Sequence, residues 1–193
     1  NYISQCDSTN LYVNKEYAYS LFMQFKYDEA IPLYEKLIAQ GFDNFESNFI
    51  LGLCYEDQPD NEKALKHYQK AVQFKNDNAT CLFHLALIEK SFCMDSLSMA
   101  HFNQSLEVSL PKDRALRTYK WLADLHFQHS RYADAARDFE LSILYDEEDD
   151  PLNYYNAAQM FIASKNKLKA KLYLQLFLAN ANRVEDKKEA AQL

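Results

Sequence analysis

The stretch FKYDEAIPLYEKLI, residues 25–38, decides the fold because its spacing recurs along the chain. Ala30 is followed four residues later by Tyr34, so the two side chains lie on one face of a helix. The same spacing returns in PDNEKALKHYQKAV (59–72), CMDSLSMAHFNQSL (93–106), SRYADAARDFELSI (130–143) and NKLKAKLYLQLFL (166–178). The pairs are Ala30/Tyr34, Ala64/Tyr68, Ser98/Phe102, Ala135/Phe139 and Ala170/Leu174. Subtracting residue numbers places successive small residues 34, 34, 37 and 35 positions apart.

A second small residue stands twelve positions before each of these. The five residues are Ala18, Gly52, Ala86, Ala123 and Ala158. A fixed offset between two small residues predicts two antiparallel helices that approach closely where neither carries a bulky side chain. Each unit is therefore predicted to be a helix A, a short turn and a helix B.

On these motifs the chain resembles the tetratricopeptide repeat family, whose unit is a helix–turn–helix of 34 residues. The resemblance implies an all-α fold, a right-handed α–α superhelix (solenoid) of about five helix–turn–helix repeats. It covers residues 11–182, with units near 11–44, 45–78, 79–112, 116–149 and 151–182. Residues 1–10 are read as an N-terminal flank. Residues 183–193 are read as a polar capping helix or a truncated continuation, since the last unit of a solenoid has no neighbour.

Several positions depart from the family pattern. Asn14 and Asn48 stand where a large apolar residue is expected early in helix A, and Leu37 and Phe177 fill a third small position. The third junction, around LPKD (110–113), is taken as the longest, which would explain the spacing of 37. Pro32 cannot donate a backbone hydrogen bond inside helix B of the first unit. A kink or loosened turn is predicted there, the alternative being that Pro32 lies close enough to the helix start to be absorbed.

Composition narrows the function classes. The 193 residues are 48 % apolar and carry a formal net charge of -7, which argues against a nucleic-acid or anionic-membrane partner. No apolar run is long enough for a membrane span. Cys6, Cys54, Cys81 and Cys93 have no paired spacing and are predicted to be reduced, mostly buried thiols. The default location is a soluble cytoplasmic one, with periplasmic or secreted locations open if a signal peptide was removed.

No catalytic motif is found, so the chain is predicted to be a non-enzyme without a cofactor. His126 and His129, with Asp124 nearby, offer a conceivable metal pair, but solvated or packed histidines are the preferred interpretation. The acidic stretch DEEDDP (146–151) lacks the alternating ligands and central glycine of a calcium loop. Acidic residues just before a helix favour its N-terminus, and the stretch is read as a helix start.

The family resemblance also implies that helix A of each unit lines a concave face that holds a protein or peptide. Projected onto this sequence, the groove residues are Lys15, Tyr19, Phe22, Phe49, Ile50, Leu53, Phe83, His84, Leu87, Lys120, Trp121, Asp124, Phe127, Tyr155, Asn156 and Gln159. The competing interpretation is that many of these residues pack in the core. Family members that clamp a terminal carboxylate use basic and amide residues, and only Lys15 fits that pattern, so a more apolar or helical ligand is expected.

Three functional hypotheses follow. The first is a protein-interaction adaptor that binds a peptide or protein segment in an aromatic-rich groove. The second is a ligand-sensing regulatory module of a larger chain, and the third is an enzyme with an unrecognised site. The sequence carries no signal for an oligomeric state.

Overall fold

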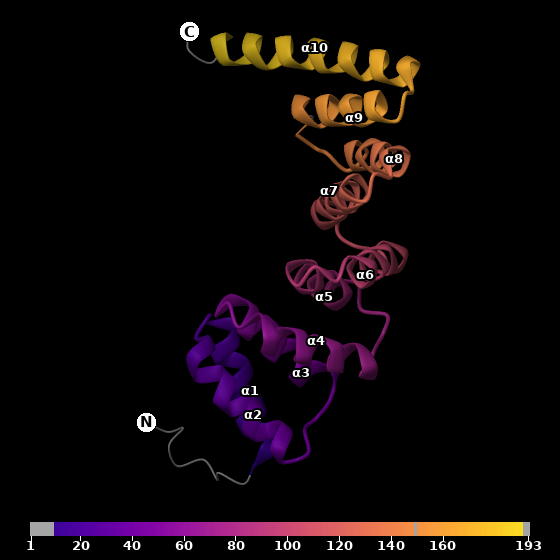
Figure 1. Cartoon of the computed structure of the whole chain (residues 1–193). Coiled ribbons are helices and arrows are strands. Elements are labelled where there is room, and N and C mark those ends of the chain that lie inside the picture. The colour runs from indigo at the N-terminus through magenta and orange to yellow at the C-terminus, as the bar shows by residue number, and fades with distance from the viewer. Residues whose placement is uncertain (1–9, 149, 191–193) are drawn as a thin grey trace. The chain divides into compact units, whose positions relative to one another are not determined.

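The computed structural model describes residues 10–148 and 150–190, with side chains described as far as residue 181. Within these residues every regular element is an α-helix (Figure 1). The helices are α1 (Leu11–Met23), α2 (Tyr27–Ala39), α3 (Phe45–Asp57), α4 (Asn61–Phe74), α5 (Ala79–Ser91), α6 (Asp95–Val108), α7 (Lys112–Gln128), α8 (Tyr132–Ile143), α9 (Pro151–Ala163) and α10 (Lys167–Ala190). The predicted all-α repeat fold is confirmed, because consecutive helices pack as five A–B pairs.

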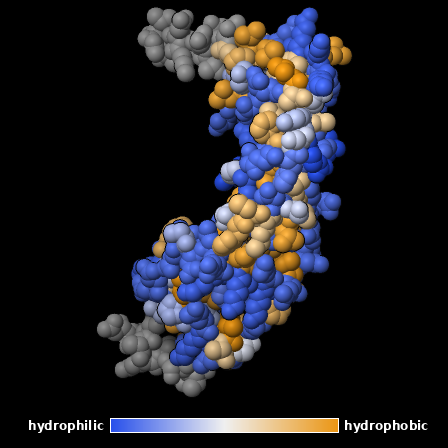
Figure 2. Space-filling model, viewed as in Figure 1, coloured by the Kyte–Doolittle hydropathy of each residue, from blue (hydrophilic) through white to orange (hydrophobic). Residues whose placement is uncertain are grey.

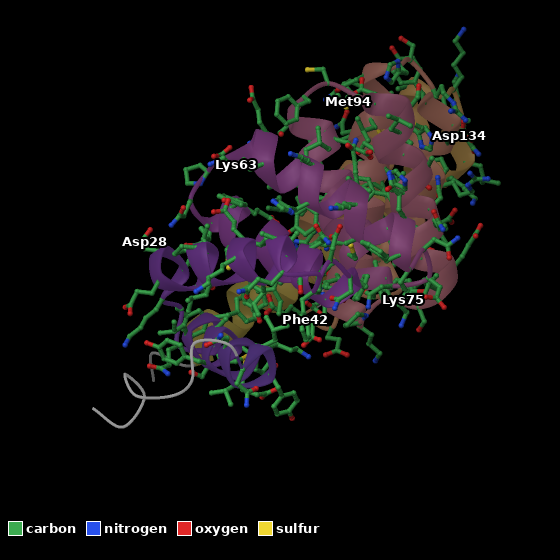
Figure 3. The ribbon with its side chains drawn as sticks, turned by 90° about the horizontal axis from the view of Figure 1, so that it is seen from below. Asp28, Phe42, Lys63, Lys75, Met94 and Asp134 are labelled. Carbon is green, nitrogen blue, oxygen red and sulfur yellow. The ribbon has the colours of Figure 1, made fainter. Side chains whose placement is uncertain are left out.

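The helix pairs divide into two compact units. The N-terminal unit ends at Val108 and contains three pairs, while the C-terminal unit begins at Ser109 and contains two. Figure 3 shows the regular path of the chain in the N-terminal unit. The turns within pairs, marked by Asp28, Lys63 and Met94, lie along one edge, and the connections between pairs, marked by Phe42 and Lys75, lie along the other.

Local hydrogen bonds fix where the helices begin and end. Asn10, Asn44 and Asn78 each accept a bond from a backbone N–H in the first turn of α1, α3 and α5. Such caps satisfy donors that have no partner inside the helix. Every A–B turn closes with a backbone bond between residues five apart, such as Lys26 N–H to Leu21 O at 3.0 Å. This is the bond of a Schellman motif, which ends helix A and reverses the chain.

The predicted close approach of helices A and B is observed in every unit. All ten small residues are buried, and Ser98 Oγ donates to the backbone oxygen of Ala86 at 2.8 Å, directly across the contact. The aromatic one turn further along helix B fills the space beside it, since Tyr34, Tyr68 and Phe102 are fully buried. The sequence periodicity therefore marks the core of each pair.

Two details of the sequence are explained by the packing. Asn48 is fully buried at a position where an apolar residue was expected. Its Nδ2 donates to Asp43 Oδ1 and to the backbone oxygen of Asn44, both at 2.8 Å, and its Oδ1 lies 3.0 Å from His67 Nδ1. The amide is thus fully satisfied, as burial of a polar group requires. Cys54 and Cys81 are free and buried as predicted, and burial raises the pKa of each thiol to about 12.

Helix α2 continues through Pro32, and the proline side chain is exposed. The structure corrects the expectation for the third junction. The spacing of 37 does not come from a long junction. Instead α7 has 17 residues and begins at Lys112, ahead of the expected start at residue 116, whereas α1, α3, α5 and α9 have 13.

The two chain ends also differ from, or lie beyond, what the structure shows. Residues 183–190 continue α10 and do not form a separate helix. Cys6, with the rest of residues 1–9, and residues 191–193 lie outside the described residues; Cys93 is free and exposed.

We predict that a larger residue in place of Gly52 destabilises the second unit. A Cβ added to Gly52 would lie 2.5 Å from Cε1 of Tyr68, whose ring is buried and whose hydroxyl donates to Glu56. We expect Gly52→Ala to lower the free energy of unfolding by about 1–2 kcal/mol, because overpacking outweighs the gain in helix propensity. Chemical denaturation followed by circular dichroism measures this.

A double-mutant cycle provides the control. The fifth unit combines Ala158 with Leu174 at the equivalent positions. In a Tyr68→Leu background Gly52→Ala should therefore become neutral or stabilising. An equal loss in both backgrounds would show that contact with Tyr68 is not the cause.

Candidate functional site

Charged groups on the helix A face of the N-terminal unit are joined across neighbouring helices. Lys15 Nζ on α1 lies 2.7 Å from Glu46 Oε2 on α3, and this bond is the leading cause of a raised pKa for Lys15. His84 Nδ1 on α5 lies 2.9 Å from Glu56 Oε2 on α3, which also accepts from the hydroxyl of Tyr68. Burial opposes ionisation of Glu56, but the bonds from His84 and Tyr68 outweigh it and lower its pKa. These pairs hold successive A helices together.

The aromatic residues expected on this face lie beside other aromatic rings of the same unit. The rings of Tyr19 and Phe22 lie 6.1 Å apart on α1, and Tyr19 is 40 % exposed. Phe49 on α3 is half-buried, and its ring lies 6.2 Å from that of Tyr68. Leu53 and Leu87 are also half-buried. The face is therefore partly open, with apolar side chains that are shared between the core and the surface.

Two of the expected groove residues belong to the core. Ile50 is 4 % exposed and Phe83 is 2 % exposed. The ring of Phe83 packs against that of Phe102 on α6, at a centroid distance of 6.0 Å. The core-packing interpretation is thus correct for these two positions, and neither offers a surface to a partner. The periodicity of helix A places Ile50 and Phe83 at the boundary between the core and the exposed face. It does not determine how the helix is rotated about its axis.

In the C-terminal unit, α7 carries a hollow on its helix A face. The hollow has a volume of about 230 Å³ and is lined by Arg117, Lys120, Trp121 and Asp124. These residues are spaced by three, one and three positions, so they share one side of the helix. Trp121 and Asp124 are half-buried. The structure thus brings together Lys120, Trp121 and Asp124, which the sequence had placed in the groove, and adds Arg117.

The remaining predicted residues of this unit lie outside the hollow. Phe127 is 45 % exposed, with its ring 5.6 Å from that of Tyr132. Tyr155 on α9 is 39 % exposed, with its ring 5.4 Å from that of Phe177 on α10. Asn156 and Gln159 are half-buried on α9. These residues leave polar and aromatic groups on α9 within reach of solvent.

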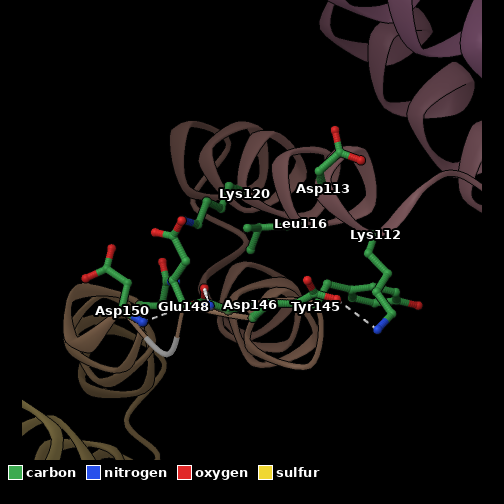
Figure 4. A pocket seen from close by; sticks show the side chains of 10 residues that line it. Lys112, Asp113, Leu116, Lys120, Tyr145, Asp146, Glu148 and Asp150 are labelled. Carbon is green, nitrogen blue, oxygen red and sulfur yellow. Dashed lines mark hydrogen bonds and ion pairs between the residues drawn. The ribbon is translucent and has the colours of Figure 1, made fainter.

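A larger pocket lies between α7 and the connection from α8 to α9 (Figure 4). Its volume is about 470 Å³, and it is lined by Lys112, Asp113, Leu116, Lys120, Tyr145, Asp146, Glu147, Glu148, Asp150 and Asn153. Asp150 caps α9 by accepting from Leu152 N–H, which confirms the reading of the acidic stretch as a helix start. The sequence did not predict the pocket, because its residues on α7 and those on the α8–α9 connection are far apart in the chain.

Apolar side chains also gather at the end of the described chain. Ile162 on α9 and Leu168, Leu172 and Leu178 on α10 are each at least half exposed. Figure 2 shows such apolar residues on the surface of these two helices. A hollow of about 430 Å³ lies among them, lined by residues that include Ile162, Leu174 and Leu178. No helix within the described residues covers it.

Comparisons with known proteins agree with this repeat architecture. The family model for the anaphase-promoting complex, cyclosome, subunit 3 matches residues 23–93. The crystal structure of YrrB, described as a TPR protein with an unusual peptide-binding site, superposes with a TM-score of 0.72 at 15 % identity, covering 94 % of this chain and 91 % of YrrB. The chain therefore has the fold of tetratricopeptide repeat structures.

Two further proteins are similar to most of this chain, one in structure and one in sequence. MamA superposes with a TM-score of 0.75 at 16 % identity, over 95 % of this chain and 96 % of MamA. DnaJ homolog subfamily C member 3 of Gallus gallus is 24 % identical over 190 residues, which is 90 % of this chain. The chain spans 38 % of the length of that relative. No helix within the described residues is long and apolar enough to cross a membrane.

Three of the histidines pair with carboxylates: His84 with Glu56, His101 with Glu89 and His126 with Asp138. His126 Nδ1 lies 2.6 Å from Asp138 Oδ2, and both side chains are buried. Burial raises the pKa of Asp138, although His126 opposes the shift. His129 lies at the end of α7 and is exposed. Among the described residues no group of three or more His, Cys, Asp or Glu side chains is placed to hold a metal ion.

The His126–Asp138 pair occupies a recurring position in the tetratricopeptide unit. Two positions correspond between units, one nine residues before the small residue of helix B and one three residues after it. Their side chains are in contact in units two to five, and in the first unit both belong to the same apolar cluster. The five pairs are Leu21/Leu33, Tyr55/His67, Glu89/His101, His126/Asp138 and Phe161/Tyr173. The first member is buried in every unit. Glu89/His101 and His126/Asp138 are the same contact with the acid and the imidazole exchanged.

This equivalence predicts that the buried pair is structural. Asp138→Leu alone should lower the free energy of unfolding by about 3–5 kcal/mol, because His126 is left without its partner. His126→Leu/Asp138→Leu, which copies the Leu21/Leu33 pair of the first unit, should unfold within about 1 kcal/mol of wild type. Denaturant titration of the three proteins measures both values. A double variant as unstable as the single one would contradict the assignment.

Proposed function

We propose that the chain is an adaptor that holds a segment of a partner protein against the helix A surface of its C-terminal unit. The observation that carries this proposal is the hollow beside Trp121 on α7. Binding sites are concave, mostly apolar surfaces with a few polar groups that fix orientation. The α7 hollow has this composition.

The residues of the hollow have different roles in the proposed binding. Trp121 provides a large, rigid apolar surface, and tryptophan is among the residues that most often dominate binding free energy. Arg117 and Lys120 lie one turn or less from it on one side, and Asp124 lies three residues further along α7. A partner segment with an apolar anchor and flanking charges of both signs matches this arrangement.

The N-terminal unit extends the proposal to a second, more apolar surface. Lys15 and His84 are already paired with Glu46 and Glu56, so their charges are taken up inside the unit. What remains available is the apolar surface of Tyr19, Phe22, Phe49, Leu53 and Leu87. This composition supports an apolar or helical ligand in place of a terminal carboxylate.

The similarity to YrrB gives independent support. YrrB is described as having an unusual peptide-binding site.

Peptide selection tests the proposal. A random peptide library is selected on the immobilised chain, and the affinity of each selected peptide is measured for wild type and Trp121→Ala by fluorescence anisotropy. We expect at least about tenfold weaker binding to Trp121→Ala, because truncation of a tryptophan anchor costs more than a tenfold change in affinity.

The matched control is Phe74→Ala, which removes an aromatic that is 50 % exposed at the end of α4. It should leave the affinity unchanged. Circular dichroism and thermal melting confirm that both variants are folded. Peptides that bind all three proteins equally would place recognition away from α7 and overturn the proposal.

A further inference from the structure

The hollow at α9 and α10 is lined by two rows of side chains that repeat every four residues along α10. The rows are Ala170/Leu174/Leu178, which is apolar, and Lys167/Lys171/Gln175, which is polar. Ile162 on α9 and Lys165 on the turn after it complete the lining. Rows with this spacing are the ridges between which a neighbouring helix packs. The shape of the hollow therefore suits a helix.

The apolar row is the one that earlier repeat units pack against the following helix A. The equivalent of Leu178 is Ile38 in the first unit, Val72 in the second and Ile143 in the fourth. Each of these three is half-buried and packs against an apolar cluster that contains residues of the next helix A. Leu178 is 59 % exposed, and α10 is the last helix of the described chain (Figure 1). The row thus continues a packing interface of the fold without the helix that covers it in earlier units.

The polar row departs from the earlier units by being basic. The positions of Lys165, Lys167 and Lys171 hold no basic residue in the first four units. At the position of Lys171, which is exposed, those units have Ile31, Leu65, Met99 and Ala136. Whatever packs on α10 therefore meets positive charge where the helices inside the array meet apolar side chains.

The three lysines of the hollow are available to a partner. None of their ammonium groups forms an ion pair or hydrogen bond with a described residue, and no carboxylate is among the side chains that line the hollow. The chain as a whole carries a formal net charge of -7, so this basic cluster is a local exception. Opposite charges across an interface guide association and set the register of the partners. The lysines thus favour a helix that carries acidic residues beside its apolar stripe.

A second copy of this chain fits the hollow less well. Two α10 helices packed on each other would place lysines against lysines, and like charges across an interface are unfavourable. Helix α1 exposes apolar side chains at Tyr12, Tyr19 and Met23, but Glu16 is its one carboxylate. One acid cannot pair with three lysines, so a separate, acidic partner is favoured.

We propose that the α10 face, made of the apolar row together with Lys165, Lys167 and Lys171, docks an acidic amphipathic helix of a partner protein. Docking of an apolar helix stripe into a groove is a general mode of peptide recognition. The α10 face shares no lining residue with the hollow beside Trp121. It is therefore a second site, and it does not rest on the proposed function of α7.

The experiment uses a designed helical peptide as the probe. The peptide has about 18 residues, or about five turns, with leucines spaced by three and four and glutamates on both sides of the leucine stripe. Its fluorescein-labelled form is titrated with the chain and followed by anisotropy. Two matched peptides serve as controls, one with the same residues scrambled around the helix and one with lysine in place of every glutamate. We expect saturable binding of the acidic amphipathic peptide and at least about tenfold weaker binding of both controls.

One pair of variants tests the apolar row. Leu178→Ser should weaken binding of the acidic peptide about tenfold, because a leucine that the peptide buries is lost. The matched control is Leu152→Ser, since Leu152 is also 59 % exposed but does not line the hollow. It should leave the affinity unchanged. Circular dichroism verifies that both variants are folded.

A second pair tests the lysines by exchanging charge. Lys165→Glu/Lys167→Glu/Lys171→Glu should lose the acidic peptide by at least about tenfold and bind the lysine peptide in its place. Lys26→Glu/Lys36→Glu/Lys66→Glu changes the net charge equally at exposed lysines of the N-terminal unit and should behave as wild type. Trp121→Ala should also retain full affinity, which separates this site from the one on α7.

Several results would overturn the inference. Absence of saturable binding, or equal binding of the scrambled peptide, would show that the α10 face does not recognise such a helix. Sensitivity to Leu178→Ser without sensitivity to the lysine reversal would show a face for any apolar helix, such as helix A of a further repeat. Self-association of the chain in sedimentation velocity that is abolished by Leu178→Ser would assign the face to a second copy.

Discussion

The close approach of helices A and B at a pair of small residues is the constraint on which the whole structure depends. It occurs in all five units, from Ala18 against Ala30 to Ala158 against Ala170. In the second unit the gap is so narrow that even a methyl group on Gly52 would overlap Tyr68. Once the helices are held at this distance, the aromatic one turn along helix B has only one space to fill. The turn geometry and the next contact along the pair then follow.

The next contact along each pair, between the residue nine positions before the small residue of helix B and the one three positions after it, accepts side chains of different chemistry. The position is filled by two leucines in the first unit, by stacked rings in the second and fifth, and by a carboxylate and a histidine in the third and fourth. Acid and imidazole even exchange helices between Glu89/His101 and His126/Asp138. The two side chains must fill the available volume. If they are polar, they must also hydrogen-bond each other, because buried polar groups need partners.

This difference between spacing and chemistry explains what the sequence could predict. The period and the two small residues predicted the helix pairs, and Lys120, Trp121 and Asp124, which were predicted together, line one hollow on α7. Ile50 and Phe83 were misplaced, because a small rotation of helix A decides whether a boundary residue faces the core. The pocket at Asn153 was not predictable from any local pattern, since it joins α7 to a connection about 30 residues later. Its one sequence signal, the run DEEDD, has an adequate explanation as a helix start.

The two units differ in which helices their charged side chains join. In the N-terminal unit, the pairs Lys15–Glu46 and His84–Glu56 join successive A helices, so these charged side chains are paired within the unit. In the C-terminal unit the link between neighbouring pairs runs along the B helices, where Glu140 on α8 accepts from Lys169 and Tyr173 on α10. Lys112 on α7 pairs instead with Glu147 on the α8–α9 connection. The α8–α9 connection spans residues 144–150 and is the longest between pairs in the described chain, and extra length at such a connection is tolerated at little cost. The charged residues of α7 and the acidic connection beside it form a polar surface of the C-terminal unit.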